Sequence, residues 1–260
     1  MKPLFLLTCL IAQPLLAIDY ALVIGIGNYQ DPSVQKLSNA KNDVTNYNHI
    51  LNHWNVNKKN RIVLLNKNAT KANIINSLSS IAENIKKNDR FFMFFSGHGT
   101  SLFDENYEEQ LQKAGLKNLM QNSGAILPYD FNPNRLSETL IIGKRKLSKY
   151  IKEIDQKGVK SLIVFDACFA ENSIRNKSNK WINRTPHILT NNQSYPYKNI
   201  IYIASSIIQS QSGTFSPILE ECLNKSKNLN KLKICINKEI SNSMQIPAIL
   251  SNQGKTTIFK

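Results

Sequence analysis

The sequence predicts an α/β fold in which a mostly parallel six-stranded sheet carries helices on both faces. Two runs of residues, 91–95 and 162–165, are uninterrupted by polar side chains, as in the buried central strands of a parallel sheet. Segments with a strand pattern also alternate with segments of helical periodicity. The chain has 260 residues, of which 42% are hydrophobic, and this is enough for one large domain.

The first half of the chain has the pattern β-α-β-α-β. We expect strands at residues 21–27, 61–65 and 91–96. Ser38 or Asn39 can cap the helix between the first two strands, and Thr70 can cap the helix between the second and the third. Because crossovers between parallel strands are right-handed, this order predicts a parallel arrangement.

The second half supplies the remaining elements. A short helix over 108–119 is followed by extended structure over 125–128, and a further helix is predicted over 147–154. Strands are expected at 161–165, 199–204 and 246–250, and helices at 215–223 and 232–244. Residues 171–198 form a long polar stretch, and loops of this length are usually functional or mobile. No internal repeat or second domain is evident.

The first 17 residues have the pattern of a signal peptide. Lys2 gives a positive start, residues 4–16 are mostly apolar, and Ala17 suits cleavage before Ile18. We therefore expect residues 1–17 to be removed, residues 18–260 to form the domain, and the protein to be exported to the periplasm or secreted. No later segment approaches the ~18 apolar residues of a membrane helix, so no transmembrane anchor is expected.

The chain is basic, with 33 Lys and Arg residues against 18 Asp and Glu and a formal net charge of +15. Such an excess can mark a nucleic-acid, membrane or glycan partner. The lysines are scattered, however, and no nucleic-acid motif or basic stripe with interleaved aromatic residues is found. A solvated surface is the favoured interpretation, and no nucleic acid is expected as a partner.

Three cysteines remain once the signal peptide is removed. In an oxidising compartment Cys222 and Cys235 can pair and leave Cys168 free. A loop of that size contributes roughly 3 kcal/mol in the chain-entropy model. The alternative is a pair of buried thiols on neighbouring helical faces, and the sequence does not separate the two.

A histidine and a cysteine follow the two apolar runs. His98 comes just after the strand at 91–96, and Cys168 just after the strand at 161–165. Ligands of open α/β sheets bind beyond the carboxyl ends of the strands, so these side chains can share one cleft. The pair indicates a cysteine hydrolase. Either residue alone is more often an inert core group.

The motifs around these residues resemble the caspase–metacaspase peptidase family, and the resemblance runs from Tyr20 to Phe259. The histidine motif is Ser96-Gly97-His98-Gly99 and the nucleophile motif is Asp166-Ala167-Cys168. Further matching stretches are residues 21–29, 37–43, 127–130, 204–206 and 212–220. The wide His-to-Cys spacing and Asp166 are more similar to bacterial metacaspase-like members than to animal caspases. The resemblance implies a caspase-like three-layer sandwich and a cysteine-type endopeptidase.

In such an enzyme Cys168 attacks the peptide carbonyl, and His98 promotes the thiolate and protonates the departing amine. The resemblance makes the backbone N–H groups of Gly99 and Cys168 candidates for the oxyanion hole. The partner is then a peptide or protein substrate. The sequence carries no indication of oligomeric state.

Charge predicts the specificity. Asp166 lies two residues before Cys168, where a carboxylate favours Arg or Lys before the scissile bond. Asp130, by resemblance, and Ser205 and Ser206 are expected to line or border the same pocket. The alternative for Asp166 is a buried, hydrogen-bonded strut.

The chain departs from the family after the nucleophile, where Phe169-Ala170-Glu171 replaces a small, flexible triplet. Phe169 can narrow the cleft, and this keeps a second interpretation open: a catalytically weak caspase-fold binding module that uses its basic surface. Residues 172–198 occupy the place of a linker that relatives often cleave during maturation. The basic residues suited to self-cleavage there are Arg175, Lys177, Lys180 and Arg184. The alternative is an ordinary exposed basic loop, and the sequence does not separate the two.

No cofactor or metal site is predicted. His49 and His53 are one helical turn apart, but no third ligand is evident. Some metacaspases need calcium, and the chain has a small acidic cluster. Its residues are Asp104, Glu105, Glu108 and Glu109. They lack the alternating pattern of a calcium loop, so a solvated face is expected and calcium dependence stays open.

Overall fold

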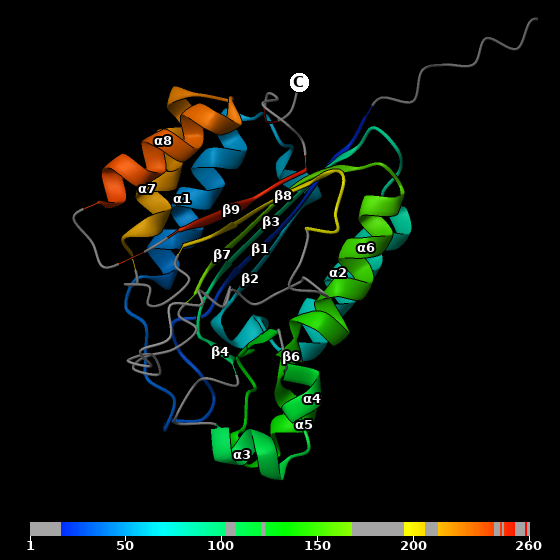
Figure 1. Ribbon diagram of the computed structural model, residues 1–260, viewed down its shortest axis with the longest axis vertical. Helices are drawn as coiled ribbons and strands as arrows, with labels where there is room; N and C mark the ends of the chain where they lie inside the picture. The colour runs from blue at the N-terminus through cyan, green and yellow to red at the C-terminus, as the bar shows by residue number, and fades with distance from the viewer. Residues whose placement is uncertain are drawn as a thin grey trace, which may run out of the picture.

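The computed structural model describes residues 17–101, 108–120, 123–167, 195–205, 213–241, 247–252 and the single residues Gln245 and Ile258. A six-stranded sheet with the strand order β2-β1-β3-β7-β8-β9 lies at its centre (Figure 1). The strands are β1 (Asp19–Gly25), β2 (Arg61–Leu65), β3 (Arg90–Ser96), β7 (Lys160–Asp166), β8 (Ile200–Ala204) and β9 (Ala248–Leu250). All pairs are parallel except β8 with β9. The predicted six-stranded, mostly parallel sheet is confirmed.

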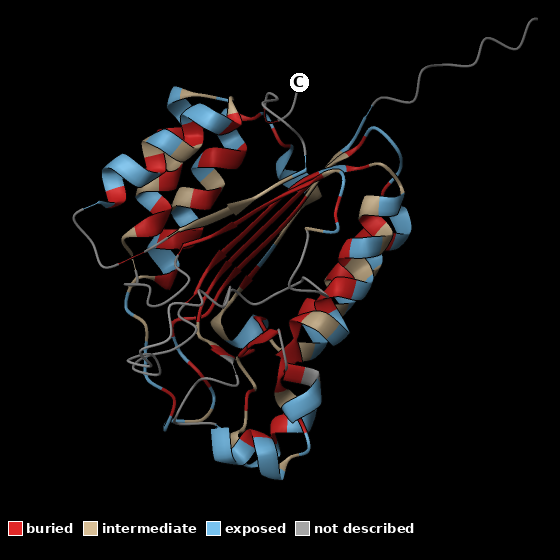
Figure 2. Cartoon of the chain, in the orientation of Figure 1, coloured by how far each residue is buried: buried red, intermediate tan, exposed pale blue. Residues whose placement is uncertain are grey.

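Helices cover both faces of this sheet (Figure 1). One layer holds α1 (Ala40–His53), α7 (Phe215–Lys225) and α8 (Leu229–Ile240); the other holds α2 (Lys71–Asn84) and α6 (Ser148–Gln156). Alternate residues of β1 serve the two cores: Ala21 and Val23 pack toward the first layer, Leu22 and Ile24 toward the second. Figure 2 shows the result, with buried central strands and helices exposed on their outer faces. The three-layer sandwich implied by the resemblance is confirmed.

Local sequence explains several of the helix boundaries. The Thr70 hydroxyl accepts a hydrogen bond from the Asn73 N–H at 3.2 Å and caps α2, as predicted. Asn39 precedes α1 without a side-chain cap. The α8 helix begins three residues earlier than predicted because the side chain of Asn228 accepts from the N–H groups of Asn230 and Lys231.

The helix predicted over 108–119 is divided into α3 (Glu108–Lys113) and α4 (Lys117–Met120). Gly115 lies between them with φ of +68°, a left-handed conformation that ends a helix and suits glycine. The last strand was also predicted too long, since β9 begins only at Ala248.

A second, three-stranded antiparallel sheet was not predicted apart from its middle strand. It consists of β4 (Gly99–Ser101), β5 (Gly124–Ile126) and β6 (Ile141–Ile142), in that order. Short helical segments occur at η1 (Lys58–Asn60), η2 (Asn66–Asn68), η3 (Pro133–Arg135), α5 (Leu136–Thr139) and the π-helical turn η4 (Gly143–Leu147). Because β4 begins directly after His98, this sheet fixes the chain that leaves the histidine.

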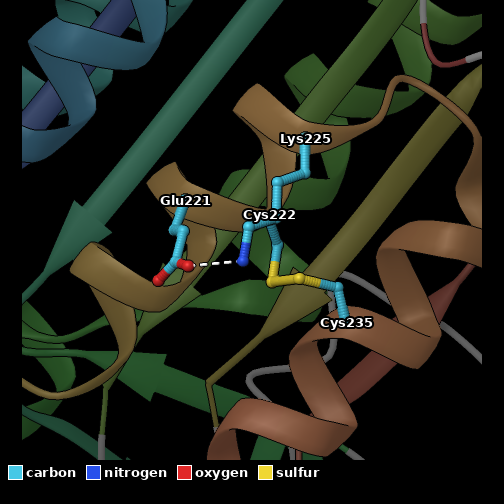
Figure 3. The surroundings of a disulfide bond; sticks show 4 residues. All are labelled: Glu221, Cys222, Lys225 and Cys235. Carbon is cyan, nitrogen blue, oxygen red and sulfur yellow. Dashed lines mark hydrogen bonds and ion pairs between the residues drawn. A yellow bond between two sulfur atoms is a disulfide. The ribbon is translucent and has the colours of Figure 1, made fainter.

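A disulfide joins Cys222 on α7 to Cys235 on α8 (Figure 3). An ion pair between Glu221 and Lys225 lies on the same turn of α7. Cys222 is fully buried, and the bond links the two outer helices of one layer.

Within the described part of the chain no helix is long and apolar enough to cross a membrane. The signal-peptide prediction concerns residues of which 1–16 lie outside the described part.

Candidate functional site

The strands that lead to the predicted dyad are neighbours. β3 and β7 pair in parallel over their full length, and their last residues, Ser96 and Asp166, are register partners. Beyond the strands the Gly97 N–H still donates to the Asp166 carbonyl at 3.3 Å. His98 follows Ser96 by two residues, and Cys168, outside the described residues, follows Asp166 by two. The sheet therefore brings the two motifs to one edge.

The imidazole of His98 is oriented by a backbone carbonyl. Its Nε2 lies 2.7 Å from the carbonyl oxygen of Gln35. A carbonyl can only accept, so Nε2 carries the proton and Nδ1 is the nitrogen able to take one up. In the neutral form of this half-buried ring, Nδ1 is therefore the basic nitrogen.

Tyr29 supports the same residue. Its hydroxyl oxygen accepts from the His98 backbone N–H at 2.7 Å, and the two rings lie 5.3 Å apart. A Cβ at Gly97 would come within 2.8 Å of the Phe95 ring and 3.2 Å of the Tyr29 hydroxyl, which explains the glycine there. The role of Gln35 could not be predicted from the sequence, because Gln35 contributes a main-chain atom.

Gly99 is the first residue of β4 and pairs with Ile126. The Leu127 N–H donates to the His98 carbonyl at 3.0 Å, so the backbone on both sides of the histidine is held. The other proposed oxyanion donor, the N–H of Cys168, lies outside the described residues.

Asp166 is only 5% exposed. The hydroxyl of Tyr47, on α1, lies 3.4 Å from Asp166 Oδ2 and donates to it. The pKa of Tyr47 is well above its ordinary value, first because of burial and then because the carboxylates of Asp166 and Asp43 are close. The structure thus provides contacts for the strut interpretation of Asp166 and places its carboxylate at the predicted edge.

Asp43, the last residue of the matching stretch 37–43, is a second carboxylate at this edge, and it was not predicted as a site residue. It is fully buried and accepts hydrogen bonds from the hydroxyls of Ser96 at 2.7 Å and Ser216 at 2.6 Å. Burial raises its pKa, while the two hydroxyls act in the opposite direction. Asp43 therefore connects α1 with β3 and α7.

The other predicted pocket residues lie in different places. The Asp130 carboxylate accepts from the Lys71 N–H at 2.7 Å, at the first residue of α2. Its contact is thus with the start of that helix. Ser205 is buried, and its N–H donates to the Phe165 carbonyl beside Asp166. Ser206, like Phe169-Ala170-Glu171 and residues 172–194, lies outside the described part.

In the described chain no group of three His, Cys, Asp or Glu side chains is arranged to hold a metal. His49 Nδ1 lies 3.2 Å from Glu220 on α7, and Glu109 pairs with Lys113 at 2.6 Å. His53 is exposed. Asp104 and Glu105 are outside the described residues. A surface hollow between α1 and β2 contains none of the predicted site residues; it is lined by Thr45, Asn48, His49, Asn52, Lys58, Arg61 and Val63.

Known proteins resemble this chain in sequence and in fold. A family model described as "Metacaspase, peptidase C14 domain" matches residues 20–176, which include both His98 and Cys168. Metacaspase-1 of Plasmodium falciparum (isolate 3D7) is 31% identical over 176 residues, 62% of this chain. The match covers 26% of that relative, so the chain corresponds to about a quarter of its length.

A solved structure, protein GSU0716 of Geobacter sulfurreducens, superposes with a TM-score of 0.63 and covers 94% of this chain and 97% of its own. At 16% identity it supports the fold alone.

Proposed function

Since the chain belongs to the metacaspase, peptidase C14 family, we propose that it is a cysteine endopeptidase that uses Cys168 and His98 and cleaves after Arg or Lys. The observation that carries the dyad is the bond from His98 Nε2 to the Gln35 carbonyl. In the neutral ring this bond makes Nδ1 the basic nitrogen, and His98 follows the strand that pairs with the strand leading to Cys168.

The reaction has two steps. Nδ1 of His98 takes the thiol proton, and the Cys168 sulfur attacks the peptide carbonyl while backbone N–H groups at Gly99 and Cys168 stabilise the oxyanion. The C–N bond then breaks as the imidazolium gives its proton to the leaving amine. Water, deprotonated by the same imidazole, hydrolyses the acyl-enzyme and restores the thiol.

Two buried carboxylates support the preference for a basic residue. Asp43 accepts from Ser96 and Asp166 accepts from Tyr47, and Ser96 and Asp166 are register partners, so the two carboxylates lie at the edge that carries His98. Negative charge in a partly dehydrated site favours a cationic side chain and disfavours Asp. Ser205, beside Phe165, and Ser206 remain proposed neighbours of this pocket, as does Asp130, although its carboxylate accepts from the Lys71 N–H.

The disulfide supports the proposed export. Disulfides persist in oxidising compartments and are rare in reducing ones. Cys222–Cys235 is therefore in keeping with residues 1–17 as a signal peptide and a periplasmic or secreted protein. The N-terminus of the exported protein is then expected at Ile18 or nearby.

The test uses the chain from Ile18 and fluorogenic peptides that differ only in ending with Arg, Lys or Asp. Wild type is compared with Cys168→Ala, His98→Ala and the exposed-site control His53→Ala, each with calcium and with a chelator. Cleavage after Arg or Lys that is lost in the first two variants and kept in the third supports the proposal. Cleavage after Asp contradicts the specificity, and no cleavage under any condition favours the binding-module alternative.

A further inference from the structure

We propose that Ser216 on α7 is a positioning residue for the dyad, because its hydroxyl holds Asp43 against the strand end that carries His98. The inference rests on the proposed function of His98 and Cys168. Ser216 itself is fully buried, and its side chain hydrogen-bonds with Asp43 and Asn46.

The contacts form a continuous chain. The Ser216 hydroxyl donates to Asp43 Oδ1 at 2.6 Å, and the Ser96 hydroxyl donates to Asp43 Oδ2 at 2.7 Å. Each carboxylate oxygen thus receives one hydroxyl, and the carboxylate is fixed in the plane between α7 and β3. Ser96 is the last residue of β3, two residues before His98.

The same helix holds the other strand end. Tyr47 follows Asp43 by four residues, so the two side chains lie on one face of α1. Asp43 contacts Ser96, and Tyr47 contacts Asp166 at 3.4 Å, while Ser96 and Asp166 are register partners. One turn of α1 therefore braces both strands two residues before each member of the dyad.

Ser216 connects the contacts of Asp43 and Tyr47 to α7, which lies in the same helical layer as α1. α1 and α7 pack side by side in Figure 1, and Asn46 Nδ2 donates to the Ser216 oxygen at 2.9 Å. That bond directs the serine hydroxyl proton toward Asp43.

Removal of the hydroxyl has two consequences. Asp43 loses one of its two fixed donors, so Ser96 and the segment leading to His98 are held less firmly. The pKa of Asp43, already raised by burial, rises further because a group that lowers it is lost. Among the described residues, the groups that face Asp43 are Ser96 from β3, Ser216 from α7 and Tyr47 from α1, with Asp166 of β7 beyond Tyr47.

The experiment compares Ser216→Ala, Ser216→Thr and the control Ser161→Ala. Ser161 is equally buried and donates to the Val159 carbonyl at 3.2 Å, but it lies at the opposite end of β7. The readouts are kcat and KM on a cleaved peptide, and the pH dependence of Cys168 alkylation by iodoacetamide, which reports the dyad without any substrate. Thermal melting identifies variants that do not fold.

We expect Ser216→Ala to lower kcat ~10-fold, since small misplacements of catalytic groups are costly. The alkylation profile should shift along the pH axis, Ser216→Thr should restore both properties, and Ser161→Ala should match wild type. If Ser216→Ala does not fold, Asn46→Ala decides, with a smaller loss in the same direction.

A folded Ser216→Ala with wild-type kcat and alkylation profile overturns the inference, as does an equal loss in Ser161→Ala. The proposed dyad stands in either case provided that His98→Ala is inactive. Full activity in His98→Ala would instead contradict the proposed function of the dyad.

Discussion

His98 Nε2 donates to the backbone carbonyl of Gln35 at 2.7 Å, and this bond selects the tautomer of the ring. Because the acceptor belongs to the main chain, the side chain at position 35 does not take part. Tyr29, by contrast, contributes its side-chain hydroxyl, which accepts from the His98 N–H. The two neighbours of His98 should therefore differ in their tolerance of substitution.

Gln35→Ala is expected to keep kcat/KM within about twofold of wild type, whereas Tyr29→Phe should lower it about 10-fold. Phenylalanine keeps the ring beside His98 but removes the acceptor of the backbone N–H, a change worth about 1–3 kcal/mol when the donor is buried. Steady-state kinetics on one Arg peptide measure both. A large loss in Gln35→Ala with none in Tyr29→Phe would contradict this account of the ring.

The contrast between Gln35 and Tyr29 also shows which features can be predicted from the sequence. The main strands were predictable because buried parallel strands are continuous apolar runs, as at Phe91 to Phe95. β4 and β6 have three and two residues, too few for any periodicity. Gln35 acts through an atom that every residue possesses. Ser216 and Asp43 are 173 residues apart, and only packing of α1 against α7 brings them together.

Asp43 gives a prediction for stability against pH. Burial raises its folded-state pKa above the ordinary 3.8, so between these two values the folded protein binds more protons than the unfolded chain. Its contribution to stability therefore falls as pH rises through this window and is most favourable below it. Relative to Asp43→Asn, which cannot ionise, wild type should lose free energy of unfolding as pH increases.

Urea unfolding of both proteins at several pH values from about 4 to 7 measures the difference. If wild type instead gains free energy of unfolding relative to Asp43→Asn as pH rises, the folded-state pKa of Asp43 is lowered and not raised. Asp31→Asn serves as control: hydrogen bonds from Ser33 lower the pKa of that carboxyl below 3.8, so its contribution to stability is lost only at pH values below about 4 and should stay nearly constant over the measured range.

The disulfide should account for a substantial part of the stability of the α7–α8 layer. Its two cysteines are 13 residues apart, and a loop of this size corresponds to about 3 kcal/mol in the chain-entropy model. The double variant Cys222→Ala, Cys235→Ala should unfold at a lower urea concentration, and its free energy of unfolding should be about 2–4 kcal/mol lower than that of wild type. Reductant should destabilise wild type similarly and leave the variant unchanged; equal urea midpoints in all samples would show that the bond adds nothing.

Self-cleavage is expected in the segment 172–198, at one or more of Arg175, Lys177, Lys180 and Arg184. A basic-selective peptidase with four basic residues close after its nucleophile can use its own chain as substrate. Wild type should yield two fragments on a denaturing gel, and Cys168→Ala should remain intact. The same fragments in both proteins would assign the cleavage to another peptidase.

A substitution at Asp166 can distinguish whether this residue lines the substrate pocket or has a purely structural role. Asp166→Asn keeps the size of the side chain and an oxygen that can accept from Tyr47, but it removes the charge. If Asp166 contacts the basic residue, kcat/KM for an Arg peptide should fall about 30-fold or more, as when one partner of a dehydrated charge pair is neutralised. The matched peptide with citrulline, a neutral isostere of arginine, should be affected much less.

The ratio of the two rates is decisive because it cancels any general damage to the site. An equal fall for both peptides would make Asp166 a strut between Tyr47 and β7 and leave the basic preference to Asp43 or to other residues. Asp155→Asn provides the control, since this carboxylate on α6 accepts from the Lys198 and Asn199 N–H groups near the start of β8. It should lower stability without changing the ratio, because it lies at the end of the sheet opposite His98.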